Sequence, residues 1–242
     1  MYKRVLLKIS GEQLAGKKES GIDIEVVHFL AKEIKKVTEQ GCQVAIVVGG
    51  GNLVRGADIA GHGIHRVTAD HMGLLATLIN ALAVTDIFES KGLETRCLSN
   101  VHAEQVAEMF VHRLAEKHLE RGRVVIVAGG TNRPYLTTDT AAVQLALELH
   151  CEATLKATKV DGVYDMDPMK FAEASKHDRL TFEHAVSNAK VKVMDKAALG
   201  LAMEHDLPVV VFDGMKAGNL LKIVQGEAVG TKIHSFLVDV PK

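Results

Sequence analysis

The chain of 242 residues has few of several residue types, and each shortage excludes a class of protein. Its three cysteines, Cys42, Cys97 and Cys151, form no C-x-x-C pair, which argues against a disulfide framework or a zinc ribbon and suits a reducing compartment. The formal net charge is only -1, whereas a dedicated nucleic-acid binder normally has a clear basic excess. We therefore expect no nucleic-acid partner.

Long apolar runs are also missing. The longest ones, such as residues 44–48, are far too short to cross a bilayer, and residues 1–13 combine charge with only a short apolar run. We therefore expect no membrane partner, no signal peptide and a cytoplasmic location. Tryptophan is absent and aromatic residues are only 4% of the chain, whereas glycine is common, with 21 residues. Because glycine adopts backbone conformations closed to other residues, this composition favours tight turns on a scaffold of helices and sheet.

What is present is an alternation of strand and helix patterns. Continuous apolar runs predict buried strands at residues 5–9, 44–48, 124–127, 153–155 and 208–212. Helical spacing of apolar residues predicts helices near residues 23–40, 69–91, 103–121, 140–150 and 194–204. Residues 161–180 look polar and irregular. This alternation predicts an α/β fold with a mostly parallel sheet, helices on both faces and one domain over residues 1–242.

Loops at four predicted strand ends concentrate glycine and basic side chains, at residues 8–12, 49–56, 129–139 and 156–164. In an open parallel sheet the carboxyl ends of the strands share one edge, where ligands bind. Glycines let backbone N–H groups approach an anion, and a helix N-terminus adds partial positive charge. Taken singly, each loop also fits a plain turn, an edge charge or a helix cap. Together they predict a cradle for several phosphates.

One segment of the chain nearly matches the P-loop, a phosphate-binding motif. Residues 11–18 match G-x-x-x-x-G-K, but Lys18 stands where a P-loop needs Ser or Thr to hold Mg²⁺. A P-loop also leads straight into a helix, whereas Asp23 is the first plausible helix cap after this segment. The sequence therefore argues against a P-loop.

Six segments then give a resemblance that runs in order over essentially the whole chain. They are KISGE at 8–12, GGGNLVRG at 49–56, TADHMGLLAT at 68–77, TTDTAA at 137–142, KATKVDGVYDMDP at 156–168 and KVMDKAA at 192–198. In these segments the chain resembles the bacterial uridylate (UMP) kinases of the amino-acid kinase superfamily. Single motifs are shared with carbamate and acylglutamate kinases, but the combination is specific to UMP kinases.

The resemblance implies a three-layer α/β/α sandwich that transfers the γ-phosphoryl group of ATP to UMP, giving UDP and ADP in pyrimidine nucleotide biosynthesis. It implies Mg²⁺ on the nucleotide phosphates, with no direct protein ligand to the metal. It also implies a homohexamer that GTP activates and UTP inhibits. The UMP side would lie mainly in the N-terminal part of the domain and the ATP side mainly in the C-terminal part.

Residue roles are implied by the same resemblance. The catalytic set would be Lys8, Asp139, which orients Lys8, and Asp195, although Asp167 and Asp195 stand one residue further apart than in the family. The ATP contacts would be Lys8, Ile9, Ser10, Gly11, Gly51, Arg55, Thr158, Tyr164 and Asp167. The UMP contacts would be Gly50, Asp70, Thr131, Asn132, Arg133, Pro134, Tyr135, Leu136, Thr137 and Thr138. The GTP-linked segment would be Gly16, Lys17, Lys18, Glu19, Ser20 and Gly21.

The chain departs from the family in the UMP loop. Residues 130–139 read GTNRPYLTTD where the family has GTGNPFFTTD. A family glycine is replaced by Asn132, which tolerates a positive φ better than most residues. Arg133 adds a rigid positive fork, and Leu136 replaces an aromatic ring. These changes leave open how strictly the chain selects UMP over CMP or dUMP.

Two other functions stay open at this point. One is an acyl-phosphate-forming kinase of the same superfamily, and the other is a non-catalytic protein of this fold that binds a nucleotide or an oxyanion. The UMP kinase hypothesis needs no general base, because a UMP phosphate is already largely ionised at neutral pH. Its chemistry would rest on positioning and on charge neutralisation by Lys8, Mg²⁺ and loop amides.

Overall fold

A computed structural model describes residues 1–54, 63–166, 168–171, 173–188, 191 and 193–235. The strands are β1 (Arg4–Ile9), β2 (Gln43–Val48), β3 (Thr95–Ser99), β4 (Glu108–Met109), β5 (Val124–Ala128), β6 (Thr154–Thr158), β7 (Val163–Tyr164), β8 (Lys176–His177), β9 (Arg179–Thr181), β10 (Val209–Asp213) and β11 (Thr231–His234). The helices are α1 (Gly11–Leu14), α2 (Ile24–Glu39), α4 (Arg66–Ser90), α5 (His112–Glu120), α6 (Thr138–Glu148), α7 (Phe182–Ser187), α8 (Lys196–Glu204) and α9 (Asn219–Gln225).

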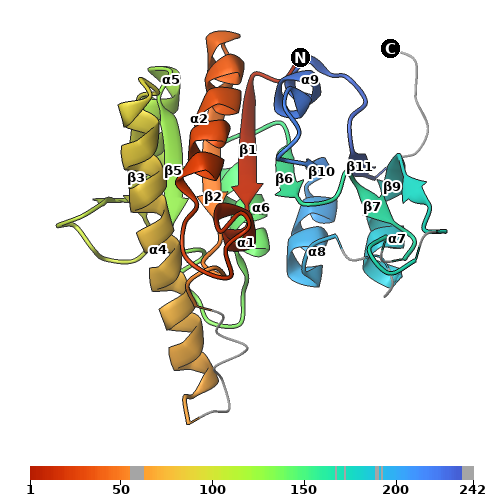
Figure 1. The fold of residues 1–242 in the computed structure, drawn as a ribbon, viewed down its shortest axis with the longest axis horizontal. Coiled ribbons are helices and arrows are strands. Elements are labelled where there is room, and N and C mark those ends of the chain that lie inside the picture. Colours follow the sequence, from red (N-terminus) through yellow and green to blue (C-terminus); the bar gives the residue numbers. More distant parts are fainter. Residues whose placement is uncertain (55–62, 167, 172, 189–190, 192, 236–242) are drawn as a thin grey trace.

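A nine-stranded sheet forms the middle layer, in the order β4-β3-β5-β2-β1-β6-β10-β11-β9 (Figure 1). Neighbouring strands in it are parallel except for the antiparallel pair β10–β11. Strands β7 and β8 pair separately. The predicted, mostly parallel sheet is confirmed, and so are the five predicted strands, with small shifts of their ends.

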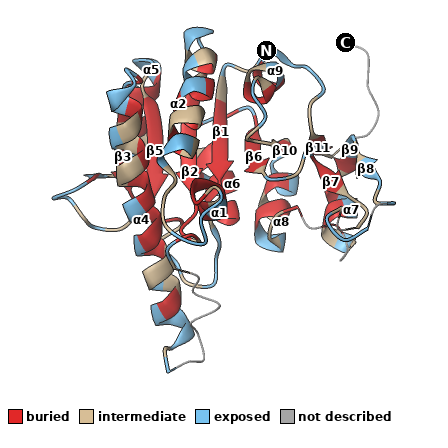
Figure 2. Ribbon diagram, in the orientation of Figure 1, coloured by how far each residue is buried: buried red, intermediate tan, exposed pale blue. Residues whose placement is uncertain are grey.

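Helices cover both faces of this sheet, because alternate strand residues enter two separate cores. Leu7 of β1 belongs to the core that contains residues of α2, α4 and α9, whereas its neighbour Leu6 belongs to the core that contains residues of α5, α6, α7 and α8. Interior strands of this kind are apolar on both faces, which is why they appear in the sequence as continuous apolar runs. Figure 2 shows the central strands buried along their length. The predicted three-layer sandwich is confirmed.

Helix α4 is long and apolar enough to cross a membrane by length and composition alone, as no other helix of the described residues is. It lies against α2, β3 and β5, and its buried residues include Ala81, Val84 and Phe88. These contacts make it a core helix of the sandwich.

Three sequence predictions were wrong in detail. The helix expected over residues 103–121 begins only at His112, because Leu98 and Glu108 pair as β3 and β4 and hold the chain extended there. Residues 161–180 contain β7, β8 and most of β9. Ser10, not Asp23, is the first helix cap after β1: Ser10 Oγ accepts from Gln13 N, and Gln13 Oε1 accepts from Ser10 N.

Candidate active site

Two lysines stand side by side near the carboxyl ends of neighbouring strands. Lys8 of β1 is in register with Lys156 of β6, and residues in register on parallel strands face the same side of a sheet. That side is the one to which Leu6 points, where α6 covers the sheet. Asp139, the second residue of α6, therefore meets both lysine side chains.

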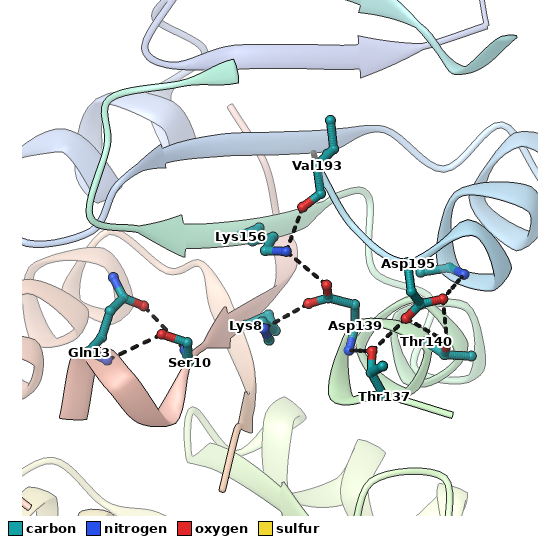
Figure 3. A network of polar contacts seen from close by, with 10 residues as sticks. Lys8, Ser10, Gln13, Thr137, Asp139, Thr140, Lys156, Val193 and Asp195 are labelled. Carbon is teal, nitrogen blue, oxygen red and sulfur yellow. Dashed lines mark hydrogen bonds and ion pairs between the residues drawn. The ribbon is translucent and has the colours of Figure 1, made fainter. Parts of the chain in front are cut away.

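The three side chains form what we term the lysine–carboxylate centre, defined as Lys8, Asp139 and Lys156 (Figure 3). Lys8 Nζ lies 2.7 Å from Asp139 Oδ1, and Lys156 Nζ lies 2.8 Å from Asp139 Oδ2. Lys156 Nζ also donates to the carbonyl oxygen of Val193. The exposed fractions of the Lys8, Asp139 and Lys156 side chains are 8%, 13% and 14%. The predicted pairing of Asp139 with Lys8 is present, and the second lysine is an addition.

Burial and the neighbouring charges shift the pKa of Asp139 in opposite directions. Burial raises the pKa of Asp139, but the attraction of Lys8 and Lys156 outweighs it, so the pKa of Asp139 lies below its ordinary value. Burial and repulsion by Lys8 lower the pKa of Lys156 further than Asp139 raises it. Two ammonium groups share one carboxylate, so the centre carries a surplus positive charge that an anion would neutralise.

Asp195 is the cap of helix α8, where its Oδ1 accepts from Ala198 N at 2.9 Å. Its carboxylate also accepts from the hydroxyls of Thr137 and Thr140 at the start of α6. Asp195 therefore fastens α8 to the helix start that carries Asp139. The sequence predicts a catalytic carboxylate here, and the structure shows it engaged by hydroxyl groups and a backbone amide.

Glycines let the loops after β1 and β2 pack directly on one another and on α4. A Cβ at Gly11 would lie 2.6 Å from Gly51 N, and a Cβ at Gly50 would lie 2.7 Å from Gly73 O, both too close for any side chain. Buried Asn52 and Asn80 fix this contact, since Asn80 Nδ2 donates to Gly49 O at 2.7 Å and the two amides bond each other. The predicted juxtaposition of Ser10, Gly11, Gly50 and Gly51 is therefore present.

A cavity of about 210 Å³ opens beside these glycines. Its lining brings together residues that are distant in sequence, namely Gly50, Gly51, Val54, Asp70, Gly73, Leu74, Thr77, Arg133, Leu136, Thr137 and Thr138. Six of them belong to the set that the family resemblance assigns to UMP, so that part of the set is gathered around one opening. We call residues 131–138 the acceptor loop.

Asp70 holds the acceptor loop against α4. Its Oδ2 accepts from Tyr135 N at 2.9 Å, and its carboxylate receives Arg66 Nε at 2.8 and 3.0 Å. The Arg66 guanidinium carbon lies 5.4 Å from the centroid of the Tyr135 ring. Asn132 and Tyr135 have φ values of 54° and 68°. The sequence indicates a positive φ for Asn132, which the structure shows, but gives no such indication for Tyr135.

A second cavity, of about 410 Å³, has Asp139 and Lys156 of the lysine–carboxylate centre in its wall. Apolar side chains dominate its wall, which consists of Asp139, Lys156, Ala185, Val186, Asn188, Val191, Val193, Met194, Lys196 and Leu199. All the described residues that the family resemblance assigns to ATP lie outside this lining. Among them, Thr158 Oγ1 donates to Val160 O and Phe212 O, and Tyr164 OH donates to Asp161 Oδ1 at 2.6 Å. Arg55 and Asp167 lie outside the described residues.

Comparison with known proteins identifies the family of this chain. The model of the amino acid kinase family matches residues 3–213. The chain belongs to the amino acid kinase family. The uridylate kinase of Sulfurovum sp. (strain NBC37-1) is 51% identical over 228 residues, which is 94% of this chain and 97% of that protein.

Two solved structures resemble this member of the amino acid kinase family over nearly its whole length. The UMP kinase of Bacillus anthracis aligns with a TM-score of 0.92 at 38% identity, covering 96% of each chain. The UMP kinase of Ureaplasma parvum aligns with a TM-score of 0.89 at 32% identity, covering 97% of this chain and 100% of the other.

Sequence reasoning missed three polar residues of this amino acid kinase site. Lys156 opens a segment that the sequence singles out, but its register with Lys8 is a pairing between distant segments. Asn52 and Asn80 are buried amides whose role appears only once the glycine loops are packed. A buried Asn inside an apolar helix was the one signal available for Asn80, because buried polar groups need partners.

The segment at residues 16–21 also contacts this site. Gly21 N donates to Asn52 O at 3.1 Å, and Asn52 Nδ2 donates to Gly21 O at 2.7 Å. Lys18 Nζ donates to Ile22 O at 3.0 Å, which closes the segment on itself. Gly21 therefore joins the end of this segment to the loop after β2.

Proposed function

We propose that this chain is a UMP kinase, which transfers the γ-phosphoryl group of ATP to UMP and yields UDP and ADP. The observation that carries the proposal is the lysine–carboxylate centre, since Asp139 and Lys156 line the apolar cavity against α7 and α8, and Asp139 directly follows Thr137 and Thr138 of the cavity bordered by the acceptor loop. The uridylate kinase relative and the two UMP kinase structures support the same substrates.

In this proposal the two lysines act on the phosphates. Both reactants are anions, so catalysis requires holding them in line and neutralising the charge on the transferred group. Lys8 and Lys156 supply two ammonium groups whose positions Asp139 fixes before substrate arrives. The start of α6 adds the partial positive charge of a helix N-terminus at Thr138 and Asp139. Asp139 is then a positioning residue, because it acts through the lysines.

The residues around the centre fit Mg²⁺ held by the nucleotide rather than by the protein. Mg²⁺ prefers oxygen ligands, chiefly carboxylates and phosphates. The carboxylate of the centre and its neighbour Asp195 are both engaged: Asp139 faces two ammonium groups, and Asp195 caps α8 and accepts from threonine hydroxyls. The ion on the ATP phosphates would supply additional neutralisation of charge, with Lys8 and the Gly11 and Gly51 loops beside those phosphates.

The remaining features of the proposal follow the family resemblance. We assign the acceptor loop, Gly50 and Asp70 to UMP, the β1 and β2 loops to the ATP phosphates, and residues 16–21 to GTP activation, with UTP as inhibitor. We also propose that the chain forms a homohexamer, is cytoplasmic and acts in pyrimidine biosynthesis. Exposed Leu75 and Ile79 on α4 support self-association, because they present apolar surface to solvent. Sedimentation velocity would measure the oligomeric state.

A coupled ADP-release assay with ATP and Mg²⁺ tests the activity. The acceptors are UMP, CMP, dUMP, carbamate and acetylglutamate. We expect turnover with UMP to exceed turnover with every other acceptor. Preference for carbamate or acetylglutamate would indicate an acyl-phosphate-forming kinase, and ATP binding without turnover of any acceptor would indicate a non-catalytic protein.

The Lys8→Ala variant tests the mechanism in the same assay. Removal of a comparable charge-stabilising donor costs roughly 10²–10³ in kcat, so a loss of that size is expected. Lys32→Ala is the matched control, because Lys32 is exposed on α2, and it should retain activity. A loss of tenfold or less in Lys8→Ala would contradict the proposed role of Lys8.

A further inference from the structure

Three potential metal ligands converge where the start of α5 meets the end of α6. His112 and Glu116 lie one turn apart on α5, and His150 follows α6. Their ligand atoms all lie within 4.8 Å of one another. His112 Nε2 is 3.1 Å from Glu116 Oε2, and His150 Nε2 is 3.9 Å from Glu116 Oε1. The two imidazole rings meet edge to face, with centroids 5.8 Å apart.

The backbone of His150 is fixed by the way in which α6 ends. Its φ is 53°, at a position where helices usually end with glycine. The two bonds of a Schellman motif close α6 around it, from His150 N to Leu147 O at 3.1 Å and from Cys151 N to Ala146 O at 2.8 Å. Asp206 closes α8 in the same way with a φ of 47°, so the conformation by itself does not mark a site. At the end of α6 this closure fixes the backbone of His150, whose imidazole lies beside Glu116.

The donor set indicates which ions would fit. Imidazole nitrogen suits zinc, copper and nickel, whereas Mg²⁺ and Ca²⁺ select sites made of oxygen atoms. Bonds of about 2.0–2.1 Å place the ligands of a tetrahedral ion about 3.3–3.4 Å apart, close to the observed separation of His112 from Glu116. His150 is exposed, which leaves space for a water molecule as the fourth ligand.

One positive charge opposes a cation here. Arg4 Nη1 lies 3.7 Å from Glu116 Oε1. The guanidinium is directed elsewhere, because Nη1 donates to Leu149 O and Nε donates to Gln43 Oε1, each at 2.6 Å. Glu116 Oε2 remains toward His112. The competing explanation is a network of ion pairs in which Glu116 serves Arg4 and two histidines without any metal.

We propose that His112, Glu116 and His150 bind a divalent transition cation of the zinc class. Arg4 begins β1 and His150 lies just before β6, so this place is at the amino ends of the strands, opposite the edge that carries Lys8 and Lys156. An ion there takes no part in phosphoryl transfer. It joins the start of α5 to the end of α6 and so stabilises the face of the sandwich that carries Asp139.

Thermal unfolding of the untagged, metal-free full chain with added Zn²⁺ tests the site. A ligand at about 100 times its Kd raises the Tm of a chain of this size by roughly 5–10 °C, so an increase of that order is expected. Metal analysis after gel filtration should find one zinc per wild-type chain. Replacement of Zn²⁺ by Mg²⁺ should give no increase in Tm.

The informative variant is His150→Gly, which removes a ligand and also relieves the backbone strain. Without metal its Tm should equal or exceed that of the wild type, and the increase with Zn²⁺ should disappear. His102→Ala is the control, because His102 pairs with Glu104 at 3.0 Å without a second histidine, and it should keep the increase. Kinase activity of His150→Gly without Zn²⁺ should equal that of the wild type.

Two results would overturn the proposal. One is a wild-type chain whose Tm does not respond to Zn²⁺, which would leave the ion-pair network as the explanation. The other is a His150→Gly variant that keeps the full response, which would place zinc elsewhere on the chain. Neither result bears on phosphoryl transfer, so the proposed function stands or falls separately.

Discussion

The lysine–carboxylate centre and the acceptor loop lie next to each other but are constructed in opposite ways. Lys8, Lys156 and Asp139 come from two central strands and a helix start, and their side chains are nearly buried. Tyr135 and Leu136 of the loop expose 67% and 40% of their surface, and the loop depends on Asp70 for its contact with α4. The positions of the charged side chains are thus fixed by strands and a helix, whereas the shape of the cavity bordered by the acceptor loop depends on a few hydrogen bonds.

This difference indicates where each property of the enzyme resides. Groups that neutralise charge must be held in place before substrate arrives, and strands and helices hold them more precisely than loops do. A loop on that scaffold can change its sequence with less effect on the chemistry. The departures from the family pattern at Asn132 and Arg133 fall in the loop, and the centre is kept.

The largest effect should come from Asp139→Asn. This change leaves two largely buried ammonium groups without a carboxylate, and breaking a buried ion pair from one side costs about 3–5 kcal/mol. Urea unfolding should show that loss in the free energy of unfolding. Asp86→Asn, an exposed change of the same chemistry on α4, should cost less than about 0.5 kcal/mol. A loss below about 1 kcal/mol in Asp139→Asn would show that the centre is not held by this pair.

The pairing of Asp139 with the two lysines should also appear in how the free energy of unfolding of the wild type depends on pH. The pKa of Asp139 in the folded chain lies below its ordinary value of about 3.9, so its contribution to stability is complete above that value. That contribution is lost as the pH falls through the lower folded pKa. Between about pH 5 and pH 3, the free energy of unfolding should fall more steeply in the wild type than in Asp139→Asn. Parallel curves would contradict the lowered pKa.

A smaller effect is expected from Arg66→Ala, which removes the partner of Asp70 and the cation beside Tyr135. Exposed pairs and cation–π contacts of this kind contribute about 0.5–1 kcal/mol each. We therefore expect the KM for UMP to rise by a factor of about 2–5, with little change in kcat. Arg121→Ala, an exposed change at the end of α5, is the control. An equal fall in kcat would place Arg66 in the chemistry itself.

The smallest effect should come from Asn132→Gly, which restores the residue of the family pattern. Asparagine tolerates the left-handed backbone, so the preference for UMP over CMP should change by less than about twofold. Arg133→Asn should change that preference more, because Arg133 lines the acceptor cavity. The ratio of kcat/KM for the two nucleotides measures both. The reverse order would show that backbone conformation, rather than charge, selects the base.

The parts of this structure that depend on local pattern could be predicted, and those that depend on pairing between distant segments could not. β1, β2 and β5 are unbroken apolar runs, whereas β3, with Arg96 among polar neighbours, has no such run and was missed. The pairing of Lys8 with Asp139 was predicted through the family resemblance. Lys156 was missed because only the register of β6 against β1 places it beside Lys8.

The position of β1 in the sheet has a consequence for the order in which the chain assembles. Residues 1–128 supply the strands on one side of β1, and residues 154–234 supply those on the other. During synthesis β1 therefore remains an open edge until β6 leaves the ribosome, roughly 7–30 s later at usual translation rates. Lys8 acquires its neighbour Lys156 only then. A newborn chain consequently has no complete lysine–carboxylate centre until about two thirds of it has been made.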